Sequence, residues 1–264
     1  MTAPRRLRPG VALFDVPGQG SAIRGADGEL RRVALPADRI AGLHRWWAGR
    51  GGAPPAELEA FAAAGHLGER LPWPLDRRRV LVLGGAQALI QALGAAGADP
   101  YPLDVPIDPV KIAALEPAAV CAVHDGPAPA WWSTLDPILD DGIAWLRAGV
   151  EGRHLIIEPI AEDPGDVSHA DVRARRLAAA GSAHPHLAAY WAAAAPEPLD
   201  EAEWTLVAAL LAAELRAWAL GASPAVTGVL VPSVWPARRR LRVVDLDTAA
   251  IADHPVLPVP VSAP

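Results

Sequence analysis

The sequence has a single cysteine, Cys121, among its 264 residues. One cysteine can form neither an internal disulfide nor a thiolate cage for a metal ion, so we expect a cytoplasmic protein. Long hydrophobic runs are also absent. The basic start carries too short an apolar run for a signal peptide, and the most apolar segment, Trp204–Leu220, contains Glu214 and Arg216. We therefore predict no membrane span.

Positive charge and familiar catalytic motifs are scarce as well. Lys and Arg total 24 against 30 Asp and Glu, a net charge of −6, and Lys111 is the one lysine. An acidic chain lacks the electrostatic footprint of a nucleic-acid binder. The sequence contains neither the Gly-x-Ser-x-Gly that places a nucleophilic serine nor the Gly-x-x-x-x-Gly-Lys that cradles phosphates.

Hydrophobic residues make up 52% of the sequence, which is ample for a buried core. The charged residues are distributed unevenly along the chain. Residues 1–75 hold ten arginines and seven acids, whereas residues 76–264 hold fourteen bases and twenty-three acids. The change falls at Leu71-Pro-Trp-Pro-Leu75, a proline-punctuated segment typical of a linker. We predict two domains, residues 1–71 and 76–264.

Short strand-forming runs followed by helical patterns characterise the first domain. Turn residues separate three predicted strands at Val11–Asp15, Ser21–Arg24 and Glu29–Leu35. Helical spacing predicts one helix from Ala37 and another over Pro54–Ala64. This order is typical of a small winged-helix-like α+β domain.

Alternating strands and helices predict an α/β fold with a parallel, Rossmann-type sheet in the second domain. The predicted strands are Arg79–Leu83, Tyr101–Asp104, Ala118–Val123, Trp145–Val150, His154–Ile157, Gly228–Val231 and Arg240–Leu246. The predicted helices are Ala86–Ala96, Pro129–Leu139, Ala170–Ala180, Leu187–Ala194 and Glu201–Leu220. The proline-rich tail from His254 is predicted to be extended.

The glycine turn after the first of these strands is a degenerate version of a dinucleotide-binding turn. Gly84 and Gly85 supply the tight turn, but Ala86 and Leu89 replace the glycines needed for close phosphate approach and helix packing. Asp104 lies at the distance of a ribose-binding acid. We regard Gly84, Gly85 and Asp104 as vestigial and expect no nucleotide cofactor.

The remaining chemistry-bearing residues favour structural interpretations. His124-Asp125 follows a strand end, where active-site residues often lie, but a structural role is the more frequent one. His184-Pro-His186 has no further ligand at metal-binding spacing. Cys121 lies within an apolar strand and favours packing over nucleophilic chemistry.

The segment Trp145–Gly165 resembles the ThiF-like family that partners azoline-forming cyclodehydratases in ribosomal peptide natural-product biosynthesis. Glu158-Pro159 stands at the family's Gly-Pro, and Pro164-Gly165 matches its Pro-Gly. Leu206–Leu220, Gly228–Val231 and His254-Pro255 follow in the family's order, so the resemblance covers nearly the whole chain. It implies a degenerate ThiF-like domain preceded by a peptide-recognition domain.

Departures from that family affect both the metal and the activity. The resemblance places its zinc-binding cysteines near Ser168, Asp171, Leu257 and Pro260, none of which is cysteine, so we expect no zinc. Most nucleotide-binding residues of the adenylating relatives are not recognisable here. The favoured hypothesis is a non-catalytic partner, a homodimer, that binds a precursor's leader peptide for a separate cyclodehydratase-type enzyme. The alternative is an ATP-dependent adenylating enzyme with a divergent site.

An unpaired strand edge in the first domain is the candidate peptide site, because such an edge can accept an added strand. Leu30, Arg31, Arg32 and Val33 lie on the third strand, and the two arginines can pair with acidic residues of a leader. Val33→Pro is expected to remove a backbone donor. Glu57, Leu58 and Phe61 on the second predicted helix, Pro54–Ala64, are predicted to form the other wall, although both apolar residues also suit the core.

Overall fold

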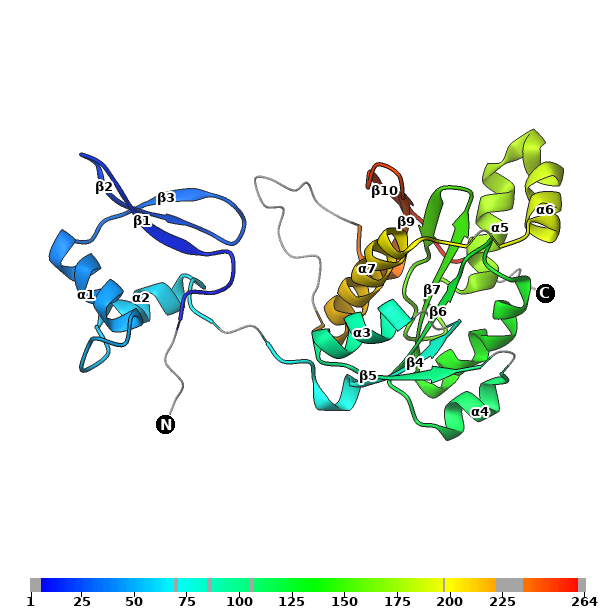
Figure 1. Cartoon of the computed structure of the whole chain (residues 1–264), viewed down its shortest axis with the longest axis horizontal. Helices are drawn as coiled ribbons and strands as arrows, with labels where there is room; N and C mark the ends of the chain where they lie inside the picture. The colour runs from blue at the N-terminus through cyan, green and yellow to red at the C-terminus, as the bar shows by residue number, and fades with distance from the viewer. Residues whose placement is uncertain are drawn as a thin grey trace. The chain divides into compact units, whose positions relative to one another are not determined.

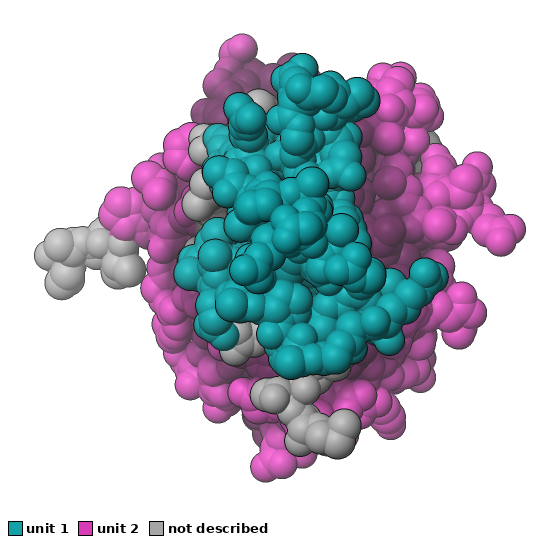
Figure 2. Space-filling view, turned by 90° about the vertical axis from the view of Figure 1, so that its left-hand side faces the viewer, with its two compact units in different colours: residues 1–72, 225–234 teal, residues 73–224, 235–264 magenta. Residues whose placement is uncertain are grey.

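The computed structural model describes residues 6–68, 71–84, 87–104, 107–196, 198–221 and 235–260. The chain divides into two compact units, which Figure 2 colours separately. The described residues up to Pro72 belong to the first unit, and the described residues from Trp73 belong to the second. Each unit has its own sheet and its own buried core (Figure 1). None of the described helices is long and apolar enough to cross a membrane.

The first unit is a small antiparallel sheet followed by two helices. It contains β1 (Ala12–Val16), β2 (Gly20–Arg24), β3 (Leu30–Val33), α1 (Ala37–Trp47) and α2 (Glu57–Ala63). The strands lie side by side in chain order. Leu13 and Ile23 of the sheet pack against Leu43, Leu58 and Phe61 of the helices. The predicted strands and helices of this part are confirmed to within a few residues.

The second unit is built on a seven-stranded mixed sheet in the order β10-β9-β8-β7-β6-β4-β5. Its strands are β4 (Arg79–Leu83), β5 (Asp99–Leu103), β6 (Ala119–His124), β7 (Ala144–Glu151), β8 (His154–Ile157), β9 (Arg240–Asp245) and β10 (Ile251–Pro255). Strands β5, β4, β6 and β7 are mutually parallel, and β7 to β10 are antiparallel neighbours. The predicted α/β class is therefore confirmed. The predicted parallel sheet is found only from β5 to β7, and the rest of the sheet is antiparallel.

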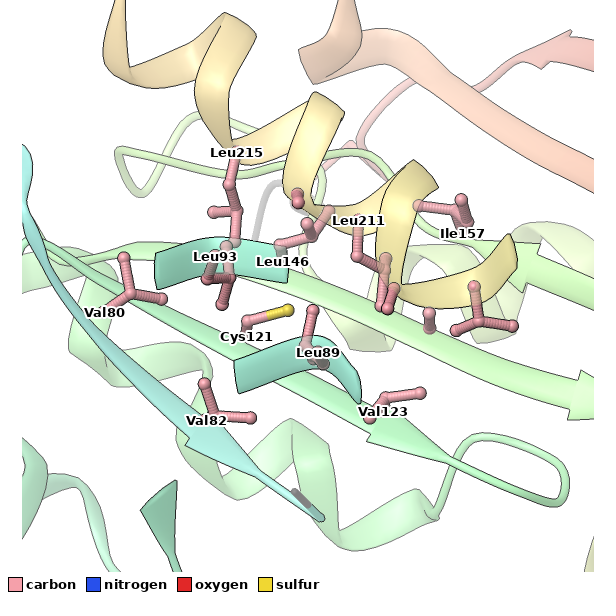
Figure 3. Packing of buried hydrophobic residues seen from close by; sticks show 14 of the residues in the cluster. Val80, Val82, Leu89, Leu93, Cys121, Val123, Leu146, Ile157, Leu211 and Leu215 are labelled. Atoms are coloured by element: carbon pink, nitrogen blue, oxygen red, sulfur yellow. The ribbon is translucent and has the colours of Figure 1, made fainter. Parts of the chain in front are cut away.

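Helices cover both faces of this sheet because its central strands are apolar on both sides. Val80 and Val82 of β4 pack with α3 (Gln87–Ala96) and α7 (Glu201–Ala219), as Figure 3 shows. Leu81 and Leu83 face the opposite way, toward α4 (Pro109–Ala114) and the 3-10 helix η2 (Ala130–Asp141). Helices α5 (His169–Ala179) and α6 (His184–Ala193) complete the unit, and α5 contributes to a smaller core with β8 and β9.

Not every element of the second unit was predicted. Helix α4 and strand β10 were not predicted, although Asp108 caps α4 and Pro109 begins it. The predicted helical segment Pro129–Leu139 is the 3-10 helix η2, which contains Pro137. The predicted strand Gly228–Val231 lies outside the described residues.

The predicted linker is partly built into the second unit. Trp73 is 4% exposed in the main core, and its indole N–H donates to the Arg77 carbonyl at 2.7 Å. Gly97, at φ +103°, brings its backbone so close to Trp73 that a Cβ there would lie 3.2 Å from the tryptophan Cβ. The second unit therefore begins at Trp73.

Candidate functional site

Strand β3 is an edge of the small sheet, since β2 is its one partner among the described strands. The register places Arg24 opposite Leu30, and the neighbouring Gly25 N–H donates to the Glu29 carbonyl at 2.8 Å. Antiparallel pairs alternate between hydrogen-bonded and non-hydrogen-bonded positions. The backbone groups of Arg31 and Val33 therefore face β2, whereas those of Leu30 and Arg32 face outward.

This alternation changes which residue can contact an added strand. The Val33 N–H serves the sheet itself, so Val33→Pro would disrupt β2–β3 pairing and not a peptide contact. The outward N–H groups at Leu30 and Arg32 are the donors that a peptide could use. The Leu30 side chain is 68% exposed on the face of the sheet away from the core.

The two arginines of β3 differ in their availability. Arg31 forms ion pairs with Asp27, at 3.3 Å, and with Glu29. These acids, Glu29 foremost, raise the pKa of the Arg31 guanidinium. Arg32 is exposed and makes no ion pair within the described part of the chain. Arg32 is therefore the cation that β3 offers to a partner.

The predicted second wall of the site is mostly part of the core. Leu58 and Phe61 are 4% and 6% exposed, and Phe61 packs edge-on against Trp47 with ring centres 5.8 Å apart. Glu57 pairs with Arg39 of α1 at 3.2 Å. These three residues hold α2 against α1 and the sheet, and they present little surface to a ligand.

The β5 edge of the large sheet is closed to an added strand. The Asp99 N–H donates to the Arg78 carbonyl, so the backbone groups of Asp99 point toward β4. Because the direction alternates along a strand, those of Tyr101 and Leu103 also point toward β4. Pro100 and Pro102 occupy the outward positions and have no N–H to donate. Strand β3 contains no proline. The contrast favours β3 over β5 as a docking edge.

The glycine turn has a structural function that needs no nucleotide. Gly84 has φ +76°, and a Cβ at this position would lie 2.2 Å from the Val123 carbonyl oxygen of β6. Leu89, at the packing position of α3, is fully buried in the main core. Asp104 is exposed just after β5, and Gly85 lies outside the described residues.

We expect Gly84→Ala to lower the free energy of unfolding by about 3 kcal/mol, because a side chain there meets both a left-handed backbone and the Val123 carbonyl. The control is Gly94→Ala in α3, where nothing lies within 4 Å and alanine is the better helix former. Urea titration followed by circular dichroism should show a loss only for the Gly84 variant. Equal midpoints for both variants would contradict the assigned close approach.

Cys121 is fully buried within β6, as the sequence indicated. Burial raises the pKa of its thiol to about 12. Only the thiolate is an efficient nucleophile, so a disulfide reagent at mildly alkaline pH should label the native protein very slowly and the denatured protein fully. Rapid native labelling would disprove the packing role.

At the positions where the resemblance places zinc ligands, hydrogen bonds connect the start of α5 to the C-terminal segment. Ser168 and Asp171 form the capping box of α5. Asp171 also accepts a hydrogen bond from the Val259 N–H at 2.9 Å, and Arg175 donates to the carbonyls of Leu257 and Pro258 at 3.0 and 2.6 Å. Within the described ranges, no three His, Cys, Asp or Glu side chains gather closely enough to hold a metal ion. The absence of zinc stays a prediction.

A buried charged cluster was missed by the sequence analysis. Arg147 of β7 is fully buried, with Nε 2.9 Å from Oε2 of Glu158 and with Nη2 donating to the carbonyls of Pro159 and Val167. His169 at the start of α5 places Nδ1 2.9 Å from Glu158 Oε1. Asp136 accepts from the backbone N–H of His169 at 3.1 Å and lies 3.5 Å from Arg147. The signal in the sequence was an arginine inside an apolar strand, which requires a buried partner.

Comparisons with known proteins identify structural relatives only. No family model matches the chain, and no curated protein sequence matches it. A heterocyclase in complex with substrate and cofactor is similar in structure, with a TM-score of 0.61 and 13% identity over 96% of this chain and 38% of the other. The present chain thus spans well under half of that heterocyclase.

Two similar structures from E. coli match this chain over most of their own length. One is MccB with ATP, with a TM-score of 0.58 and 9% identity over 97% of this chain and 98% of the other. The other is a chain of the microcin synthetase McbBCD complex with pro-MccB17 bound, with a TM-score of 0.50 and 12% identity over 97% of each chain. At these identities the likeness defines the fold.

Proposed function

We propose that this chain is a non-catalytic partner in ribosomal peptide natural-product biosynthesis. It binds the leader of a precursor peptide along β3 and presents the peptide to a separate, cyclodehydratase-type modifying enzyme. In this proposal residues 1–71 are a winged-helix-like recognition domain, residues 76–264 are a degenerate ThiF-like scaffold, and the scaffold forms a homodimer.

The observation that carries the proposal is the open edge of β3, with outward backbone donors at Leu30 and Arg32 and a cation at Arg32 without an ion-pair partner in the described chain. Main-chain hydrogen bonds to such an edge supply affinity for an extended peptide. The fold likeness to a heterocyclase and to a microcin synthetase chain supports the biosynthetic setting.

The test is the affinity of a labelled peptide encoded by a short precursor gene beside this chain's gene, measured by fluorescence anisotropy. We expect saturable binding that weakens by about fivefold in Arg32→Glu at low salt, and by less at high salt because ions screen the exposed charge. Arg31→Glu is the matched control and should have the smaller effect, because Arg31 already pairs with Asp27 and Glu29. No binding by the wild-type chain would contradict the proposal.

A second candidate function is adenylation of a peptide, favoured by the likeness to MccB with ATP. An ATP–pyrophosphate exchange assay separates the two candidates. Exchange that depends on both this chain and the peptide would establish the adenylating enzyme. Peptide binding without exchange supports the presenting partner.

A further inference from the structure

A pocket of about 230 Å³ lies in the second unit, at the carboxyl end of β6. Asp125 and Gly126, which follow β6, form one side of it, and Gly152 of the β7–β8 turn forms another. Tyr190 of α6 and Ala194 just beyond α6 form the remaining side. Ligands of open α/β sheets commonly bind at the carboxyl ends of strands, so this pocket is the natural place to examine for a ligand.

Asp125 is the one charged residue among those that line the pocket in the described structure. Asp125 is half-buried, and no ion pair or hydrogen bond engages its carboxylate within the described residues. The Tyr190 side chain, 40% exposed, lines the same space. A carboxylate and an aromatic ring that line one pocket can together attract an organic cation.

Two arginines of α5, the helix that precedes α6, have other partners. Arg176 forms a bidentate pair with Glu151, with distances of 2.6 and 2.7 Å. Arg173 donates to the Ala128 carbonyl at 3.2 Å. Both guanidinium groups also lie over the Trp191 ring, Arg173 at 4.5 Å and Arg176 at 5.0 Å from its centre. Neither arginine lines the pocket. They therefore leave the charge of Asp125 available to a ligand.

Backbone groups around the pocket argue against a phosphate. The Gly126 N–H donates to Nδ1 of His124 at 3.1 Å, and the Val150 N–H donates to the Gly126 carbonyl at 2.9 Å. A phosphate site needs free N–H donors or basic side chains. With these donors occupied and a carboxylate in the wall, the pocket disfavours an anion.

We propose that this pocket binds a single ammonium or guanidinium group on an alkyl chain, such as the side chain of a lysine or arginine. The Asp125 carboxylate pairs with the cation, and the Tyr190 ring contacts the cation and its alkyl stem. A volume of about 230 Å³ suits one such group and not a nucleotide. This binding is independent of peptide docking on β3.

The test is an amide-detected NMR titration of the full-length protein. The probes are butylammonium, N-acetyl-lysine methylamide and N-acetyl-arginine methylamide, with N-acetyl-norleucine methylamide as the neutral control. We expect saturable shifts at the Gly126 and Gly152 amides with one or more cationic probes and none with norleucine. If butylammonium binds as tightly as the lysine probe, the pocket recognises the alkylammonium group alone, and a free amine is the ligand. If only the capped amino acids bind, the ligand is the side chain of a polypeptide.

Variants give the proposal a second test. Asp125→Asn should weaken cation binding by about tenfold or more, and Tyr190→Leu by about fivefold. Asp104→Asn, at an exposed acid outside the pocket, is the matched control and should bind as the wild type does. Unshifted amides elsewhere establish that each variant is folded. Equal shifts with the norleucine probe, unchanged binding in Asp125→Asn, or no shifts with any cation would overturn the proposal.

Discussion

Replacing Glu158 with glutamine should lower the free energy of unfolding by about 3 kcal/mol, because the buried Arg147 loses its closest carboxylate and keeps only the more distant Asp136, at 3.5 Å. The side chains are 3% and 0% exposed, so water cannot replace the lost interaction. His169 Nδ1, which lies 2.9 Å from the same carboxylate, then faces an uncharged amide. Arg147→Met should be similarly destabilising, since Glu158 is then the uncompensated charge.

The double variant Arg147→Met, Glu158→Leu is the control for this prediction. It removes both charges together and should recover most of the stability, because well-packed apolar residues often replace a buried ion pair without loss. Thermal and urea unfolding of the two single variants and the double variant form the cycle that measures the coupling. Additive losses in the double variant would show that the residues act independently, contrary to the structure.

Arg32→Pro should weaken leader-peptide binding by between about tenfold and about a hundredfold, because the outward N–H disappears and a peptide carbonyl is left without its donor. A proline is tolerated on an edge strand when its nitrogen faces solvent, so the first unit should remain folded. The affinity is measured by anisotropy, with circular dichroism to verify the fold.

Arg32→Ala is the matched control, because it removes the same charge and keeps the backbone donor. It should cost a few-fold in affinity at most. If the proline and alanine variants bind the peptide equally well, the peptide does not use the Arg32 N–H, and a strand added at this position is excluded.

The local elements of the fold were predictable because their signals are local. Arg79–Leu83 reads as a buried strand and forms β4, and Asp200 caps α7 with a capping box that includes Glu203. The strands and helices of the first unit were predictable in the same way, from turn residues and helical spacing. The free edge of β3 also follows from a sheet that ends at its third strand.

The remaining features depend on contacts between distant segments. Arg147 meets Glu158, His169 and Asp136 only after β7, α5 and η2 have packed together. Similarly, Asp171 and Arg175 bind a tail segment more than eighty residues away. Periodicity carries no information on such pairings, and it could not distinguish core from groove for Leu58 and Phe61. The direction of the Val33 and Arg32 backbone groups depends on the register with β2, which needs coordinates.

Amide hydrogen exchange in β3, with and without the leader peptide, tests the central claim most directly. In the free protein the amides of Leu30 and Arg32 face outward and should exchange rapidly, whereas those of Arg31 and Val33 are bonded to β2 and should exchange slowly. Saturating peptide should protect Leu30 and Arg32 and leave Arg31 and Val33 nearly unchanged. Binding of the peptide with Leu30 and Arg32 still exchanging rapidly would contradict strand addition at this edge.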